Sequence, residues 1–97
     1  MRQKIFSAFL ESVISNEKIA ISENSILLIR YSLTEDLAQI QKYANAVLEE
    51  QDNGKRVTPA VASLFSFLLS AYIQRCYYTE AELFLRILSK SELERKT

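Results

Sequence analysis

Apolar and polar residues alternate at a helical period at the start of the chain. The apolar positions come in adjacent pairs, four residues apart: Ile5, Phe6, Phe9, Leu10, Val13 and Ile14. Such a stripe is typical of an amphipathic helix that packs on a core. Ser15 and Asn16, which end the pattern, favour turns and caps over helix interiors. The pattern therefore predicts a first helix over residues 2–15.

The next segment, residues 18–31, has no clear period. A polar stretch at 22–25 precedes the apolar run 26–29, and a short run of this kind fits either a buried helical turn or a strand. No other segment offers a strand with which it could pair. We therefore predict a short helix at about 23–31, capped by Ser22 or Asn24.

A second amphipathic pattern predicts a helix over residues 33–51. Its apolar stripe consists of Leu37, Ile40, Tyr43 or Ala44, Val47 and Leu48. Ser32 and Glu35 have the S-x-x-E spacing of a capping box, which indicates a helix start near Ser32. The same phase also allows one long helix from about Asn24 to Gln51. A break near Ser32 is favoured, because the helices predicted over 2–15 and 59–75 are only about 20–25 Å long at 1.5 Å per residue and a longer rod would extend past them.

The third amphipathic segment follows the only glycine of the chain, Gly54, which can take the left-handed conformation that ends helices. Thr58 as N-cap and Pro59 at the first helical position predict a helix over 59–75. Apolar residues occupy most of its circumference: Val61, Leu64, Phe65, Leu68, Leu69, Tyr72 and Ile73. Its polar stripe is narrow: Ser63, Ser66, Ser70 and Gln74. We expect this helix to form the centre of the bundle. The residues that we expect to be almost fully buried are Leu64, Phe65 and Leu68.

The last helix is predicted over residues 80–90. Thr79 and Glu82 have the spacing of a T-x-x-E capping box, and Tyr78 and Leu83 that of a hydrophobic staple. The polar tail 91–97 is expected to fray. The sequence therefore predicts one all-α domain, an antiparallel four-helix bundle with a short extra helical segment between helices 1 and 2.

Composition supports helices and argues against catalysis. The chain of 97 residues holds one Gly and one Pro, too few for the many turns of a sheet protein. It has no His, the commonest general base and metal ligand. One cysteine, Cys76, cannot supply a zinc site or a redox pair, and we expect it to be a small buried residue. We therefore expect no enzyme activity, no metal and no cofactor.

The net charge and the lengths of the apolar runs indicate which partners and which cellular location to expect. Twelve basic and twelve acidic residues give a net charge of zero, which disfavours nucleic acid as a partner. The uncharged run Val57–Ile73 is shorter than the about 20 residues of a membrane span, so a chain that does not span the membrane is expected. Residues 5–10 are too short for the apolar region of a signal peptide. These features indicate a cytoplasmic protein.

Candidate partner-binding residues lie in the C-terminal half. Tyr and Arg are enriched in binding hot spots, and basic residues gather toward the end of the chain. The candidates are Arg75, Tyr77, Arg86, Lys90, Arg95 and Lys96. Structural alternatives exist for several of them, because basic residues in a last turn also complement the helix dipole.

The order of motifs from Tyr31 to about Lys90 resembles the immunity proteins of class IIa (pediocin-like) bacteriocins, particularly the enterocin A immunity type. The points of likeness are Tyr31-Ser32 before an amphipathic helix, a proline at the start of an apolar helix with an aromatic end, and Tyr78-Thr79-Glu80 at the entry to the next helix. The stretch 18–31 is longer than in that family and the C-terminal tail is shorter. Members of the family are cytosolic four-helix bundles.

The resemblance implies a function by binding without catalysis. Such proteins act from the cytosolic side at the membrane receptor that the bacteriocin exploits, a mannose-type phosphotransferase permease, and prevent pore formation. The alternative is a generic helical interaction module, such as an antitoxin, adaptor or small regulator, and the apolar faces allow a homodimer. A DNA-binding regulator fits less well, because Glu80 and Glu82 would enter the groove.

Overall fold

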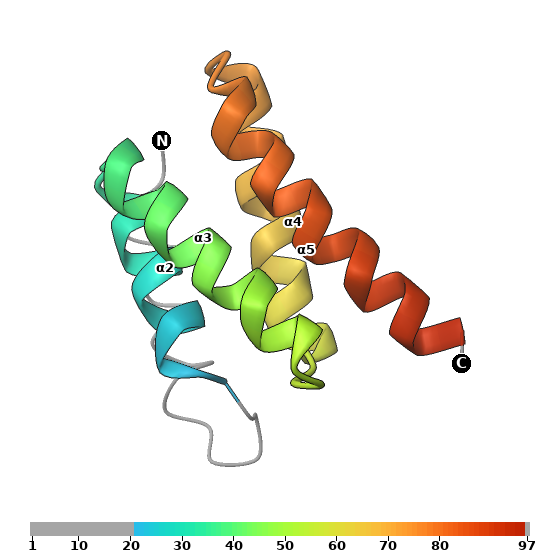
Figure 1. Ribbon diagram of the computed structural model, residues 1–97. Helices are drawn as coiled ribbons and strands as arrows, with labels where there is room; N and C mark the ends of the chain where they lie inside the picture. Colours follow the sequence, from blue (N-terminus) through green and yellow to red (C-terminus); the bar gives the residue numbers. More distant parts are fainter. Residues whose placement is uncertain (1–20, 97) are drawn as a thin grey trace.

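The computed structural model describes the backbone of residues 21–96 and the side chains of residues 21–91 (Figure 1). Within this range the chain forms four helices and no strand: α2 (Glu23–Leu33), α3 (Leu37–Asp52), α4 (Pro59–Gln74) and α5 (Tyr78–Lys96). The all-α prediction is confirmed, and the packing is consistent with a four-helix bundle. The helix predicted over 2–15 lies outside the described residues.

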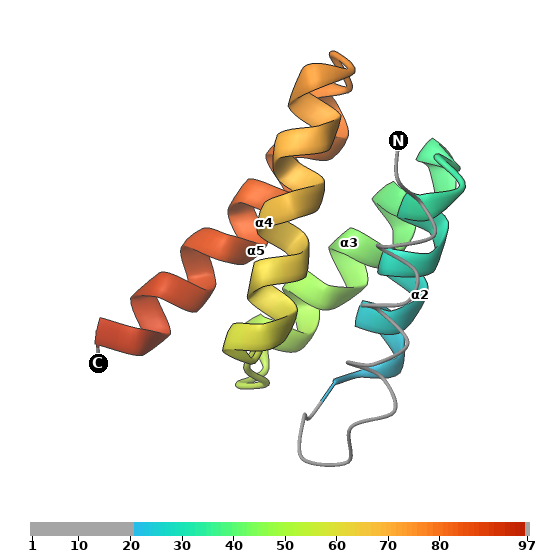
Figure 2. The same cartoon turned by 180° about the vertical axis from the view of Figure 1, so that it is seen from behind.

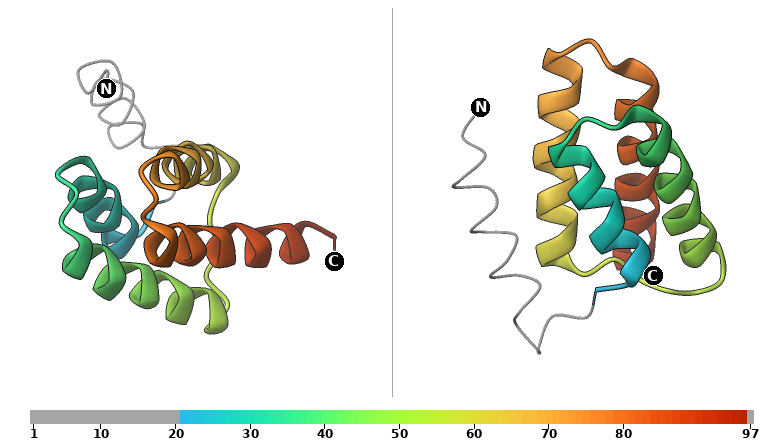
Figure 3. Two further views of the ribbon diagram at one scale, coloured as in Figure 1. Left: turned by 90° about the horizontal axis from the view of Figure 1, so that it is seen from above. Right: turned by 90° about the vertical axis from the view of Figure 1, so that its left-hand side faces the viewer.

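The helices form two hairpins that pack on each other (Figures 1 and 2). The first hairpin pairs α2 with α3, and the second pairs α4 with α5. Helix α5 also packs against α3, whereas α2 meets α4 only marginally. The contact between α3 and α5 therefore holds the two hairpins together, whereas the sequence analysis placed the helix at 59–75 at the centre of the bundle. The last turns of α5 extend past the other helices (Figure 3).

The core contains the residues that the periodicity selected. Leu64, Phe65 and Leu68 of α4 are each at most 1% exposed, as predicted. They meet buried residues of the other three helices: Leu28, Ile29, Ile40, Ala44, Val47, Ala81, Phe84 and Ile87. An aromatic cluster joins α4 to α5, since the Phe84 ring lies 6.0 Å from that of Phe65 and 5.7 Å from that of Tyr72, measured between ring centroids. The second hairpin is therefore fixed by aromatic packing.

The three connections between helices share one hydrogen-bond pattern. A residue with positive φ follows each helix: Glu35 (56°), Gly54 (93°) and Cys76 (64°). In each case its amide donates three residues back, and the next amide donates five residues back, as for Asp36 to the Tyr31 carbonyl and Tyr77 to the Tyr72 carbonyl. This is the Schellman motif, which satisfies the last carbonyls of a helix. Each helix therefore stops at a defined residue and the chain reverses there.

The break between α2 and α3 lies three residues later than predicted. The segment forms two separate helices, as predicted, and not one long helix. Ser32, however, is the penultimate residue of α2 and does not cap α3. Its hydroxyl donates to the Leu28 carbonyl at 2.6 Å inside the core. The N-cap is Asp36, whose carboxylate accepts from the Gln39 amide. The S-x-x-E spacing was misleading because Glu35 takes the left-handed conformation and ends the preceding helix.

The last helix is longer at both ends than the predicted range 80–90. It begins at Tyr78, and the Tyr77 carbonyl accepts from the Ala81 amide, so Thr79 lies inside the first turn and is no N-cap. Tyr78 is 63% exposed and does not form the expected staple. The helix continues through residues 91–96, which were predicted to fray. Ser91 is buried and donates to the Ile87 carbonyl, so the core reaches beyond residue 90.

Two threonines provide a matched test of these helix starts. Thr58 caps α4 and accepts from the Val61 amide, so Thr58→Ala should lower the free energy of unfolding by about 1 kcal/mol. Thr79→Ala should change it by less than about 0.5 kcal/mol, because this exposed residue lies within the first turn of α5. Urea unfolding of both variants measures the difference. Equal losses would mean that Thr79 does act as a cap.

Candidate binding surface on the α4–α5 hairpin

The tip of the α4–α5 hairpin holds two of the predicted candidates. Arg75 is the C-cap of α4, and its Nε lies 3.0 Å from the Glu35 carboxylate in the turn between α2 and α3. Tyr77 is half-buried, with its ring centroid 5.6 Å from that of Tyr72. Arg75 therefore ties the tips of the two hairpins together, and Tyr77 closes the end of the core. Both residues leave only part of their surface for a partner.

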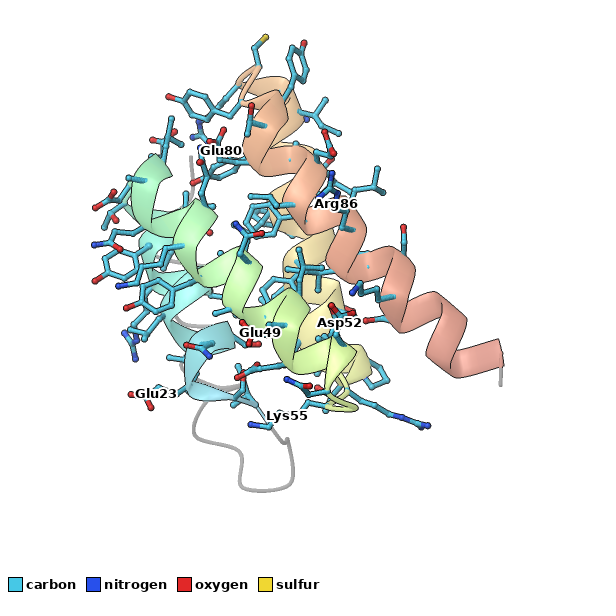
Figure 4. The ribbon with its side chains drawn as sticks, in the orientation of Figure 1. Glu23, Glu49, Asp52, Lys55, Glu80 and Arg86 are labelled. Atoms are coloured by element: carbon cyan, nitrogen blue, oxygen red, sulfur yellow. The ribbon has the colours of Figure 1, made fainter. Side chains whose placement is uncertain are left out.

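The basic candidates on α5 have different surroundings. Arg86 is exposed on the outer side of α5 (Figure 4), where it pairs with Glu82 at 2.6 Å. Lys90 forms an ion pair with Asp52 at the end of α3 and so fastens α5 to α3. Arg95 and Lys96 belong to the last turn of α5, beyond the described side chains. The six candidates therefore extend along the whole of α5, about 28 Å at 1.5 Å per residue, and form no single cluster.

Exposed apolar side chains mark a surface that the sequence analysis missed. Tyr78 and Leu85 of α5 are 63% and 52% exposed, and Ile73 of α4 is 47% exposed. Ile73 was predicted in the buried stripe and Tyr78 in a staple. Both lie beside the tip, at the end of α4 and the start of α5. We call the following residues the outer α5 face: Tyr78, Glu82, Leu85, Arg86 and Ser89.

The sequence does contain a signal for this face. Tyr78, Glu82, Leu85 and Ser89 are spaced by four, three and four residues, which places them on one side of a helix. All four are exposed. The signal was hidden because the neighbouring Leu83, Phe84 and Leu88 supply a stronger apolar stripe for the core.

Cys76 lies at the tip and is exposed, so the expectation of a buried cysteine is wrong. Its positive φ places it at the turn after α4, outside the core. The Tyr78 hydroxyl donates to its sulfur at 3.5 Å, and this hydrogen bond raises the pKa of Tyr78 above its ordinary value. The pair connects the turn to the first residue of α5.

A second surface feature is a hollow of about 270 Å³ between the starts of α2 and α4 and the end of α3. Its polar wall is Glu50, whose carboxylate accepts from Ser22 Oγ at 2.7 Å and Asn24 Nδ2 at 2.9 Å. Lys55 lies 4.0 Å from the same carboxylate. These contacts fasten the start of α2 to the end of α3. Of the charged groups of the hollow, Glu50 and Lys55 are therefore already engaged within the fold.

Among the side chains of residues 21–91, no group of three or more metal-ligating residues comes together. None of the described helices is both long and apolar enough to cross a membrane. The exposed residues Cys76 and Tyr78 lie at the hairpin tip, and the charged residues Glu82 and Arg86 lie on the outer α5 face.

Comparisons of the chain with protein-family models, with curated proteins and with solved structures gave no match.

Proposed function

We propose that this chain is a bacteriocin immunity protein that acts by non-catalytic binding on the cytosolic side of a membrane receptor. The observation that carries the proposal is the exposed apolar and basic surface along the α4–α5 hairpin, with Ile73 and Tyr78 open to solvent near the tip and Leu85 next to Arg86 along α5. Exposed aromatic and arginine side chains are typical of binding hot spots. The all-α fold and the order of motifs from Tyr31 to Lys90 agree with the resemblance to pediocin-like immunity proteins.

The proposed mechanism is occupancy of the receptor–bacteriocin complex. The mannose-type phosphotransferase permease that the bacteriocin uses would present a cytosolic surface to the hairpin. The hairpin suits this task because aromatic packing around Phe84 makes it rigid. A rigid surface loses little conformational entropy when it binds. Binding would then hold the permease closed and prevent pore formation without any covalent step.

Expression in the cytoplasm of a sensitive strain tests the proposal. The wild-type chain should protect against one or a few pediocin-like bacteriocins in a growth-inhibition panel, and purified protein added outside the cells should not. Arg86→Glu should reduce protection while the protein stays folded, because Arg86 is 59% exposed and its single ion pair is on the surface. Lys90 is less suitable, since its reversal would also break the contact with Asp52.

Arg56→Glu is the matched control. Arg56 is exposed in the connection between α3 and α4, at the opposite end of the hairpin from the tip, so the same charge reversal there should leave protection unchanged. A well-expressed and folded wild-type chain that protects against no member of the panel would overturn the proposal. The generic helical interaction module would then be the better description.

A further inference from the structure

We propose that two copies of this chain pair through the outer α5 face, antiparallel to each other about a two-fold axis. Large apolar side chains on this face are open to solvent, with Tyr78 63% and Leu85 52% exposed. Ser89, on the same side of the helix, is small and allows close approach. The pairing would remove these apolar groups from water, which is the main driving force of association.

Charge complementarity indicates that the partner that binds the outer α5 face is a second copy of the chain. Along the outer α5 face an acidic residue, Glu82, precedes a basic residue, Arg86, by one helical turn. An antiparallel partner presents the same two charges in reverse order. A two-fold axis beside residue 84 therefore places Glu82 of each copy next to Arg86 of the other. The two Leu85 side chains then lie between the two ion pairs.

The charges of the whole chain do not oppose this pairing. The net charge is zero, with twelve basic and twelve acidic residues. Two copies of a strongly charged protein would repel each other, whereas a net charge near zero favours association. In the single chain Glu82 and Arg86 already pair with each other, at 59% exposure each. In the dimer the four charges would form one network at the edge of the apolar contact.

The size of the face predicts a weak dimer. The outer α5 face covers about twelve residues of one helix, roughly 18 Å long and 10 Å wide, and so has a footprint of about 180 Å² per copy. Stable dimers bury about 800 Å² per partner. The outer α5 face is roughly a quarter of this, so we expect a weak dimer with a dissociation constant of about 100 µM to 1 mM. The protein should therefore be monomeric when dilute and dimeric when concentrated.

Reciprocal charge variants of the full chain test the arrangement by sedimentation equilibrium up to about 1 mM, the upper end of the expected range of dissociation constants. Wild type should shift from monomer to dimer. Glu82→Arg leaves only basic residues at both positions, and Arg86→Glu leaves only acidic ones. Each variant alone should associate at least about tenfold more weakly than wild type, since like charges then face each other. Their equimolar mixture should form a heterodimer at least as stable as the wild-type dimer.

Glu49→Arg is the control, because Glu49 is an exposed glutamate on α3, labelled in Figure 4, and lies off the outer α5 face. It should associate like wild type. Leu85→Ser, which alters the apolar centre without a charge, should weaken association. A wild-type chain that stays monomeric at 1 mM would overturn the proposal, and so would a mixture no heavier than its two components. Circular dichroism of each variant verifies folding.

The dimer does not depend on the proposed immunity function. Self-association is measured on purified protein, whereas protection is measured in cells. Arg86 belongs to both surfaces, so a receptor complex and a dimer would compete for it. That competition alone rests on the proposed function.

Discussion

Replacing Phe84 by Ala is expected to lower the free energy of unfolding by about 3–5 kcal/mol. Phe84 has no exposed surface and contacts both aromatic rings of α4 that face it, Phe65 and Tyr72. The truncation removes this contact and leaves a cavity between α4 and α5. Helix α5 is also the helix that packs on both α3 and α4. The loss should therefore be a large part of a total stability of about 5–15 kcal/mol.

The next residue provides the control for this prediction. Leu85 is 52% exposed, so Leu85→Ala should change the free energy of unfolding by less than about 0.5 kcal/mol. Urea unfolding at low protein concentration, where the chain is monomeric, compares the two variants. Similar losses for Phe84→Ala and Leu85→Ala would contradict the orientation of α5 in the bundle. Such a result would also undermine the outer α5 face as a binding surface.

The core of the fold was predictable because its residues repeat at the period of a helix. The stripe of α3 was identified from spacing alone, and Ile40, Ala44 and Val47 are all buried. The same reasoning found the buried centre of α4. Thr58 as N-cap and Pro59 as the first residue of α4 were also correct, since both have direct sequence signals.

Two of the three helix ends were not predictable in this way. Glu35 and Cys76 adopt the left-handed conformation, which costs a residue with a Cβ roughly 1–2 kcal/mol. Sequence reasoning expects glycine or asparagine there and found only Gly54. The bonds that compensate, such as that from the Tyr77 amide to the Tyr72 carbonyl, involve backbone atoms alone. No side-chain pattern reports them, so the predicted start of α3 was four residues too early and that of α5 two residues too late.

The candidate surface was predictable only in part. Of the predicted candidates on α5, the structure shows Arg86 exposed to solvent. The roles of Arg75 and Lys90 as ties to other helices depend on tertiary contacts with Glu35 and Asp52. Burial of Ile73 was expected because α4 is apolar around its circumference. Which side of such a helix is covered depends on how its neighbours are placed, and periodicity does not contain that information.

The second large effect expected is a loss of stability at alkaline pH that comes from Tyr72. Its ring is 1% exposed, and its hydroxyl donates to the Ser32 carbonyl at 2.7 Å. Burial, with a smaller contribution from the Glu35 charge, raises the pKa of Tyr72 from its ordinary value of 10.0 to about 12. The neutral phenol is therefore the form that the folded chain holds.

The sign of the pH dependence follows from this direction. Below pH 10 the phenol is protonated in both the folded and the unfolded chain, and stability is independent of its titration. Between pH 10 and 12 the unfolded chain loses this proton and the folded chain keeps it, so the unfolded state is favoured. The difference between the two pKa values corresponds to about 2.7 kcal/mol, of which about 2.3 kcal/mol is lost by pH 12.

Tyr72→Phe isolates this contribution, because lysines that titrate in the same range are common to both proteins. At neutral pH the variant should be less stable by about 1–2 kcal/mol, since it loses the hydrogen bond to the buried Ser32 carbonyl. Above pH 10 the wild-type advantage should shrink, and at about pH 11 the two stability curves should cross, because the variant has no phenol to ionise. Urea unfolding at intervals between pH 7 and 12 measures both curves. Parallel curves over this range would show that the Tyr72 phenol ionises at the same pH in the folded and unfolded chain, and the tight packing of Tyr72 against Phe84 and Ser32 would then be wrong.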